Sequence, residues 1–325
     1  MGRSWVVLLA CALVLLAFLS LLCGTVWLSP SRFLSSDPDS HMARLILIDL
    51  RLPRLALACM VGGALGISGS VLQGLTRNPL AEPGLLGVSS GAAFGAVMAI
   101  YFGIAGSFPA AAPLMGLGGA GIGMALTFAL GRGGGTLALI LAGTAVSGLM
   151  ASLTALALNL AANPYAAYEI SNWLLGSLAD KGWNSVAMTA PFILVGCALL
   201  SLTGRALDAL SLGEAQAESL GIDLRRVRGL ALVGTALAVG AATAVTGAIG
   251  FVGLVAPHLV RPLLGHQPRR LLWPSALVGA LLLLAADVGT RLIRVGPEIK
   301  VGVFTSLVGA PFFFWLVVRL RRTAP

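Results

Sequence analysis

Few residues of this chain could perform chemistry, and the most suggestive of them is a serine. The string GVSSG at 87–91 places Ser89 in the GxSxG pattern of a serine nucleophile. That pattern requires a turn from a strand to a helix and a histidine base, and no strand is predicted before it. The three histidines stand in no context that assigns one as the base: His41, His258 and His266. We expect no catalytic residue, and a membrane-embedded hydrolase using Ser89 is one alternative.

Nucleotide-binding patterns are equally weak. The string GLGGAG at 116–121 fits the GxGxxG dinucleotide pattern, but it lies inside an apolar run with no preceding strand. A P-loop needs GxxxxGK[ST], and the two lysines, Lys181 and Lys300, follow an aspartate and an isoleucine instead of a glycine. We therefore expect no cofactor on this chain, and ATP and Mg²⁺ would be used by a separate ATPase subunit.

Metal and ion-coupling sites are not predicted either. The four cysteines lie far apart, each inside an apolar run, and form no CxxC pair: Cys11, Cys23, Cys59 and Cys197. For His258, a hydrogen bond where a helix is broken is favoured over metal binding. A secondary transporter needs a buried carboxylate near the membrane centre. Glu82 instead stands in a proline-flanked turn, and Asp287 lies one turn before Arg291, with which it would pair. Ion-coupled secondary transport is kept as an alternative.

The composition sets the class of protein. Of 325 residues, 58% are hydrophobic and 10% are charged, with a mean hydropathy of +0.95, which excludes a soluble globule. We predict an all-α polytopic membrane protein with one domain over residues 1–325. The first apolar run is too long for a signal peptide and is expected to stay. Apolar runs of about 20 residues predict ten transmembrane helices: 5–28, 54–75, 84–104, 109–131, 135–161, 185–203, 229–248, 251–265, 271–292 and 300–318.

Small residues recur at every fourth position in two of these runs. Such faces let helix backbones approach closely inside a membrane, where the hydrophobic effect does not drive association. The first set is Gly62, Gly66, Ser70 and Gly74, and the second is Gly87, Gly91, Gly95, Ala99 and Gly103.

The distribution of basic residues predicts the orientation. With ten helices both termini share one side, and 13 of the 21 basic residues fall on that side. The remaining eight fall on the opposite side: Arg32, Arg44, Arg51, Arg54, Lys181, Arg291, Arg294 and Lys300. Because basic residues favour the cytoplasm, we predict cytoplasmic termini in a plasma membrane. The net charge of +9 then reflects orientation, and no nucleic-acid partner is implied.

The segment 205–228 is a charged stretch in an otherwise apolar chain. It carries four acids and four arginines, which cannot lie in lipid. Leucines remain among these charges, with glycines at 213 and 221 on either side of a short helix-forming stretch. A helix in water with a leucine face is suited to a groove on another protein. A solvated loop without a partner is the alternative.

Several long strings together resemble one known family. They are RLPR (51–54), NPLAEPGLLGVSSGA (78–92), LGEAQAESLGIDL (212–224), GAIGFVGLVAPHLVR (247–261), ADVGTRL (286–292) and GAPFFFWLV (309–317). In this order they cover nearly the whole chain. They are similar to the permease subunit of type II ABC importers, the FecCD-type family that moves vitamin B12, haem and ferric siderophores.

The resemblance implies a homodimer with ten helices per subunit and a substrate path along its two-fold axis. Two ATPase subunits would dock from the cytoplasm, and a periplasmic binding protein would deliver the cargo. Segment 205–228 matches the coupling segment of the family, with coupling residues Leu212, Gly213, Glu214, Glu218, Leu220 and Gly221. The cytoplasmic gate of the family corresponds to Asn78, Pro79, Leu80 and Thr136. The Asn78–Pro79 pair also predicts a tight turn, which is compatible with a gate.

On the outer side, the family resemblance implies that Arg51, Arg54 and Arg291 receive acidic residues of the binding protein. The alternative is that they are interfacial arginines, with Arg291 simply pairing with Asp287. Iron chelates, ferric siderophores or haem, are the family's commoner cargo, and vitamin B12 is the alternative. Candidates for shaping the outer mouth of the path are Tyr165, Tyr168, Asn172 and Trp173.

Overall fold

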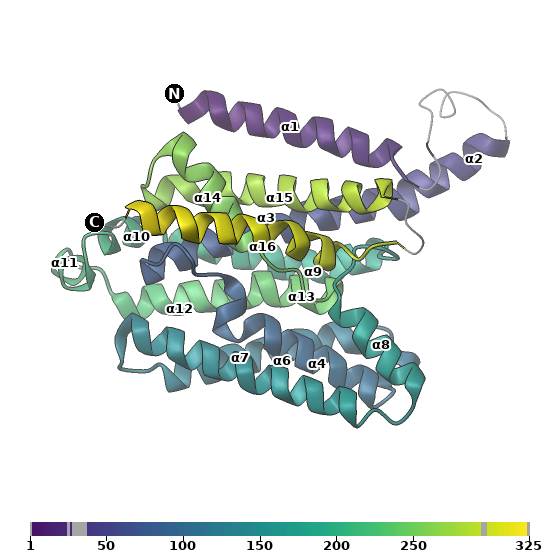
Figure 1. The fold of residues 1–325 in the computed structure, drawn as a ribbon, viewed down its shortest axis with the longest axis horizontal. Helices are drawn as coiled ribbons and strands as arrows, with labels where there is room; N and C mark the ends of the chain where they lie inside the picture. The colour runs from purple at the N-terminus through teal and green to yellow at the C-terminus, as the bar shows by residue number, and fades with distance from the viewer. Residues whose placement is uncertain (1, 25–26, 28–37, 294–297, 324–325) are drawn as a thin grey trace.

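The chain folds into a bundle of helices, described here from a computed structural model. The structure describes residues 2–24, 27, 38–293 and 298–323, and this part contains no strand. Figure 1 shows the long helices lying side by side. They are α1 (Gly2–Leu22), α3 (Leu52–Thr76), α4 (Val88–Tyr101), α6 (Ala111–Leu130), α7 (Gly135–Asn159), α9 (Trp183–Leu202), α12 (Leu224–Thr235), α14 (Val252–Leu264), α15 (Pro268–Leu292) and α16 (Val301–Thr323).

These helices match the ten expected spans in order. Seven helical segments of the described chain are long and apolar enough to cross a membrane, and three shorter apolar helices accompany them. One of the seven is continuous from α12 through a π-helical turn, η4 (Ala236–Gly240), and α13 (Ala241–Thr246). The predicted all-α polytopic fold is therefore confirmed.

Short elements connect the long helices. α2 (Pro38–Leu45) and the π-helical turn η2 (Ile46–Arg51) lengthen α3 backwards beyond the expected span. The 3₁₀ turn η3 (Pro83–Leu86) precedes α4 and α5 (Ile104–Ser107) follows it. The segment between the fifth and sixth spans contains α8 (Pro164–Leu174), with Asn163 capping its first turn. The charged stretch forms α10 (Gly204–Leu210) and α11 (Glu214–Ser219).

The predicted small-residue faces bring pairs of helices into close contact. A Cβ atom built on Gly62 of α3 would lie 2.4 Å from the carbonyl oxygen of Gly279 on α15, and one on Gly66 would lie 2.1 Å from that of Ser275. On α4, a Cβ at Gly91 would lie 2.3 Å from the carbonyl oxygen of Gly119 on α6. These backbones touch, so any larger side chain would separate the helices.

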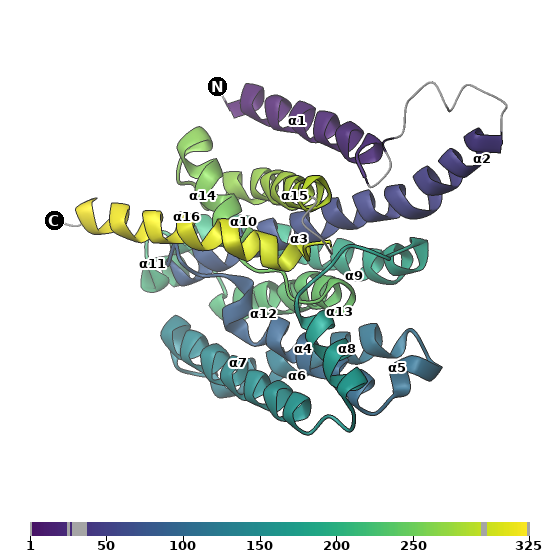
Figure 2. The ribbon, with the colours of Figure 1, turned by 45° about the vertical axis from the view of Figure 1, so that its right-hand side comes forward.

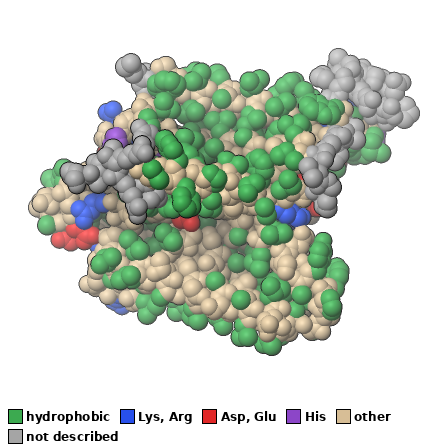
Figure 3. All heavy atoms as spheres, in the orientation of Figure 1, with side chains coloured by type: hydrophobic (Ala, Val, Ile, Leu, Met, Phe, Trp, Pro, Cys, Tyr) green, Lys and Arg blue, Asp and Glu red, His purple; other side chains and the backbone are tan. Residues whose placement is uncertain are grey.

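The two ends of the bundle differ in chemistry. α1 begins and α16 ends at one end, where α11 also lies, whereas α2 and α8 lie at the other (Figures 1 and 2). We call these the terminal end and the opposite end. On the face in Figure 3 most charged side chains gather near the two ends, and hydrophobic side chains and backbone cover most of the surface between them. Arg32 and Arg294, both assigned to the opposite side from sequence, lie outside the described residues.

Candidate functional site

The charged stretch at the terminal end, 205–228, presents two leucines to solvent. Leu212 is 65% exposed and Leu220 is 63% exposed, one on each side of α11. Leu210 is buried in the core, and Ile222 packs against it, so these two do not share the exposed face. Gly213, with φ of 120°, allows the chain to turn into α11. The segment therefore offers two separate apolar contacts instead of one continuous leucine face.

Two of the four acids in this segment, Asp208 and Glu214, bond to the rest of the bundle, and a third caps a helix. Asp208 accepts hydrogen bonds from Gln267 Nε2 at 2.8 Å and from the backbone N–H of Arg269 at 2.9 Å, at the start of α15. Asp223 caps α12 by accepting the N–H of Arg226 at 3.0 Å. The fourth acid, Glu218, is exposed. The segment is thus a firmly attached surface, unlike the solvated loop considered from the sequence.

Glu214 connects this segment to two membrane-crossing helices. Its Oε1 accepts a hydrogen bond of 2.5 Å from the hydroxyl of Thr136 in the first turn of α7. Its Oε2 lies 2.9 Å from Nη2 of Arg228 on α12. The Thr136 hydroxyl, with Arg228 and Arg77, holds the pKa of Glu214 below its ordinary value. Glu214 and Thr136, predicted separately from the family resemblance, are therefore in direct contact.

Asn78 and Pro79 form the tight turn expected from the sequence. The side-chain Oδ1 of Asn78 accepts the N–H of Leu80 at 2.9 Å, and its backbone carbonyl accepts the N–H of Ala81 at 3.1 Å. Arg77 ends α3 in the left-handed region, with φ of 49°. The turn lies at the terminal end, near Glu214, whose carboxylate is close enough to Arg77 to feel its charge.

A second charged cluster lies at the opposite end. Asp287 on α15 is fully buried and binds two arginines, Arg291 at 2.6 Å on its own helix and Arg54 at 2.8 Å on α3. Arg54 also pairs with Glu298. The predicted Asp287–Arg291 pair is confirmed, and the pair with Arg54 was not expected. The cluster joins α3, α15 and the segment before α16.

The remaining contacts of these arginines hold the end of α1. Arg291 donates to the carbonyl oxygens of Ser20 and Cys23, each at 3.0 Å, and to the Ser20 hydroxyl at 2.5 Å. Arg51 donates to the carbonyl oxygen of Leu21 at 2.5 Å. Both arginine side chains are buried, whereas that of Arg54 is 16% exposed. Cations at a helix C-terminus satisfy carbonyls that lack helical partners.

His258 belongs to a polar network between α3 and α14. Its Nδ1 lies 3.2 Å from the carbonyl oxygen of Leu254, and Arg261 donates to Gln73 Oε1 at 2.6 Å. Gln73 donates in turn to the Leu254 carbonyl at 3.3 Å. His258 is therefore hydrogen-bonded, and among the described residues no group of three His, Cys, Asp or Glu side chains converges as a metal site would require.

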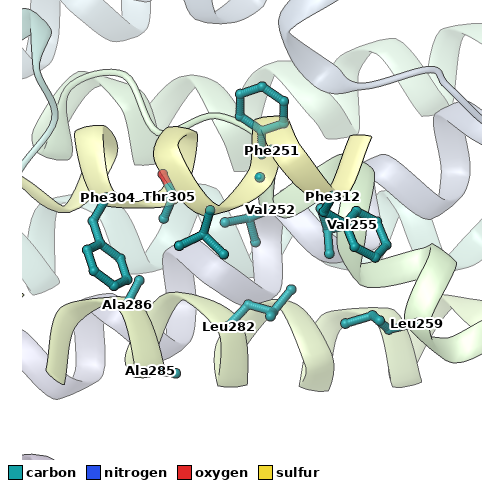
Figure 4. Close-up of a pocket in the computed structure, with 12 residues that line it drawn as sticks. Phe251, Val252, Val255, Leu259, Leu282, Ala285, Ala286, Phe304, Thr305 and Phe312 are labelled. Carbon is teal, nitrogen blue, oxygen red and sulfur yellow. The ribbon is translucent and has the colours of Figure 1, made fainter. Parts of the chain in front are cut away.

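An apolar cavity of about 310 Å³ lies between α14, α15 and α16. Side chains from the three helices converge on it in Figure 4, including Leu259, Leu282, Phe304 and Phe312. Phe251, at the start of α14, has φ of 66° and packs so closely that a Cβ on Gly309 of α16 would lie 2.4 Å from it. α16 therefore contacts α14 closely at one point and leaves unfilled space beside it.

The geometry describes a bundle with an anchored, leucine-bearing surface at one end and an arginine cluster at the other. A sequence model of the FecCD transport family matches residues 12–319. The chain belongs to the FecCD transport family. This confirms the family expected from its sequence strings, and identifies a multi-pass membrane permease subunit of an ABC importer.

Relatives of this FecCD permease align along nearly its whole length. It is 40% identical over 317 residues to the hemin transport system permease protein HmuU of Yersinia pestis, covering 95% of this chain and 93% of HmuU. It is 37% identical over 322 residues to the Fe(3+) dicitrate transport system permease protein FecD of Escherichia coli K12, covering 99% of this chain and 100% of FecD. The structure also matches a solved metal-chelate type ABC transporter in an inward-facing conformation, with a TM-score of 0.85 and 33% sequence identity. This match covers 98% of this chain and 99% of that transporter's chain.

Two contacts in this FecCD permease could not be read from its sequence. Thr136 and Glu214 are 78 residues apart, and Arg54 and Asp287 are 233 residues apart. Thr136, Arg54 and Asp287 lie near the ends of predicted spans and Glu214 lies in the charged segment between two spans, each on the same side as its partner. That side is the only signal in the sequence, and it leaves many pairings open.

Proposed function

We propose that this permease works as a homodimer with two ATPase subunits on the cytoplasmic side and a binding protein on the outer side. The observation that carries the proposal is the anchored segment 205–228, in which Leu212 and Leu220 project from a surface held to the bundle by Asp208 and Glu214. An exposed apolar pair on a charged, fixed surface suits a groove on a partner protein. In an ABC importer, whose permease lacks a P-loop, that partner is the ATPase.

The terminal end is then cytoplasmic. Basic residues outnumber acidic ones there, which supports this orientation through the positive-inside rule. Asn78, Pro79, Leu80 and Thr136 form the cytoplasmic gate, in two segments that lie near Glu214. The coupling residues are Leu212, Gly213, Glu214, Glu218, Leu220 and Gly221. The chain itself binds no cofactor, and ATP with Mg²⁺ acts on the partner subunits.

The opposite end receives the binding protein through Arg51, Arg54 and Arg291. These three arginines bring positive charge to this end, where Arg54 and Arg291 share the carboxylate of Asp287 and Arg54 also pairs with Glu298. Such a charge steers an acidic partner and fixes its register more than it raises affinity. Arg54 is the least buried member, with 16% of its side chain exposed, and makes the first contact, whereas Arg51 and Arg291 contribute their charge from beneath the surface.

The cargo is an iron chelate, either haem or a ferric siderophore. HmuU is named for hemin and FecD for Fe(3+) dicitrate, and both are similar to this chain along nearly all of its length. The alternative cargo is vitamin B12. Ion-coupled secondary transport is the alternative mechanism, and the fully buried Asp287 does not favour it because two arginines already neutralise this carboxylate.

Reconstituted vesicles test the proposal directly. Uptake of labelled haem or ferric siderophore is measured with the permease alone, with its partner ATPase, and with the ATPase, ATP and binding protein together. We expect uptake only in the complete system. Uptake driven by an ion gradient without ATP would overturn it, and turnover lost in Ser89→Ala would indicate the hydrolase instead.

A further inference from the structure

We propose that Glu214 is the residue through which the coupling segment holds the gate, by its hydrogen bond to Thr136 and its ion pair with Arg228. The inference rests on the proposed function, because it needs segment 205–228 to contact the ATPase. It goes further because it assigns a specific contact between the coupling segment and the gate, which are far apart in the sequence. Glu214 is a positioning residue in this account, since it touches neither ATP nor cargo.

The position of Thr136 makes this contact effective. Thr136 is the second residue of α7, a helix of 25 residues that crosses the bundle. A hydrogen-bonded helix moves as a stiff body, so a displacement of its first turn is transmitted along its length. Glu214 stands at the start of α11, between the exposed Leu212 and Leu220. Leu212 is separated from Glu214 by Gly213 alone, and Leu220 is separated from it by the short helix α11. A displacement of either leucine by the ATPase would therefore reach the contact with α7 over a short stretch of chain.

The two basic residues whose charges act on Glu214 belong to two further crossing helices. Arg228 lies in α12, which continues through η4 and α13 to Thr246. Arg77 ends α3 directly before the Asn78–Pro79 turn, and its charge acts on the same carboxylate. Three crossing helices thus begin or end around one side chain. Of the two gate segments, Thr136 touches this side chain, and segment 78–80 begins directly after Arg77, whose charge acts on it.

Packing does not replace this polar contact. A cavity of about 300 Å³ separates the turn between α6 and α7 from the start of α12. It is lined in part by Arg132, Gly133, Arg225 and Arg228. Gly133 and Gly135 have φ of 84° and 70°, left-handed values that other residues adopt only with strain. The hydrogen bond from Thr136 to Glu214 joins the start of α7, directly after this turn, to the coupling segment across the cavity.

Substitutions that change one atom group at a time test the connection. Thr136→Val removes the hydroxyl and keeps the shape, Thr136→Ser restores the hydroxyl, and Glu214→Asp keeps the charge but shortens the reach. The matched control is Thr144→Val, two turns along α7, whose hydroxyl is exposed and bonds only to the Leu141 carbonyl within its own helix. The readout is cargo transported per ATP hydrolysed by the complete complex in vesicles.

We expect Thr136→Val and Glu214→Asp to lower this ratio about tenfold, the change that corresponds to losing one hydrogen bond to a charged group. Thr136→Ser and Thr144→Val should match the wild type. Thr136→Val combined with Glu214→Asp should be no worse than either alone, because both remove the same contact.

Two results would overturn the inference. One is a wild-type ratio in both Thr136→Val and Glu214→Asp, provided that each complex is purified intact. The other is loss of the ATPase from the purified Thr136→Val complex, which would assign the contact to docking. Neither result touches the proposed function, whose own failure would appear as absent ATP-dependent uptake in the wild type.

Discussion

Arg54 Nε lies 2.8 Å from Oδ1 of Asp287, a carboxylate with no exposed surface, while Arg291 occupies the other oxygen at 2.6 Å. One buried acid therefore binds two cations from different helices. Because Arg291 also holds the last carbonyls of α1, the same carboxylate fixes the positions of α1, α3 and α15 at this end. Two of the three arginines proposed to receive the binding protein, Arg54 and Arg291, are thus held by the permease's own acid.

Removing that acid should destabilise the permease. Asp287→Leu leaves Arg54 and Arg291 without their shared buried counter-ion, and breaking such a pair from one side costs about 3–5 kcal/mol. We expect a clearly lower unfolding temperature of the detergent-solubilised protein. The matched control is Glu298→Gln, because the side chain of Glu298 is 42% exposed and surface pairs contribute little. Equal stability of the two variants would contradict a structural role for Asp287.

Arg54 should govern the rate of binding-protein association. Arg54→Gln removes the exposed charge of the cluster, so association should slow at low ionic strength. The difference from wild type should shrink near physiological salt, where the Debye length is about 8 Å. Kinetics on permease in nanodiscs measure this across a salt series. Arg44→Gln removes one charge at the same end, and an equal slowing there would show a non-specific effect.

The exposed leucines should be required for ATPase docking. Glu214→Arg combined with Leu220→Asp introduces charge into the apolar contact and reverses the charge beside it. We expect the folded permease to lose its ATPase during purification and to transport no cargo. His266→Asp, an exposed change between α14 and α15 at the same end, serves as the control. Normal co-purification and transport by the double variant would refute the coupling assignment.

The close packing of α3 on α15 predicts that alanine substitutions at two neighbouring glycines of α3 differ in their effect on stability. Gly62→Ala places a methyl group 2.4 Å from the backbone of α15, which forces the helices apart and should cost about 1–3 kcal/mol. Gly63→Ala meets its nearest atom at 3.7 Å, an ordinary contact. Thermal unfolding in detergent should therefore separate these neighbouring substitutions. Similar unfolding temperatures would mean that the helices are not in contact at Gly62.

The Thr136–Glu214 contact should depend on pH only under acidic conditions. The pKa of Glu214 is lowered in the folded protein, first by the Thr136 hydroxyl, so the contact stabilises the fold while the carboxylate is ionised. The stability advantage of wild type over Thr136→Val should be constant above the ordinary glutamate value, about 4.3, and should disappear as the pH falls through the lowered value. An advantage that already fades near pH 6 would contradict this.

Much of the fold follows from local properties of the chain. Runs of apolar residues long enough to cross a membrane predict the ten helices, and glycines at every fourth position predict that α3 and α4 each pack closely on a partner. The partners themselves, α15 and α6, could not be predicted, because many runs carry small residues. The periodicity also missed α2 and η2, since their polar residues break the apolar run although the helix continues.

The candidate sites were predictable by residue but not by arrangement. The sequence pairs Asp287 with Arg291 because they lie four residues apart on one helix, a spacing that brings side chains together. It gives no such rule for Arg54, 233 residues away. For the same reason Glu214 and Thr136 were assigned to separate functions. Leu210 lies among the same charges as Leu212 and Leu220 but is buried, and its burial depends on how α10 packs against the bundle.

Because of the unfilled space beside α16, the volume of the protein can change during the transport cycle. Its walls are almost entirely hydrocarbon, so α16 can tilt into it about the backbone hydrogen bond from Gly302 to the Gly176 carbonyl without moving polar groups of the walls. An arrangement that closes the space occupies less volume, and hydrostatic pressure favours whichever state is smaller. The space beside α16 is therefore a place where this bundle can be compressed, and a change in the tilt of α16 needs no energy for dehydrating polar groups in the walls of the space.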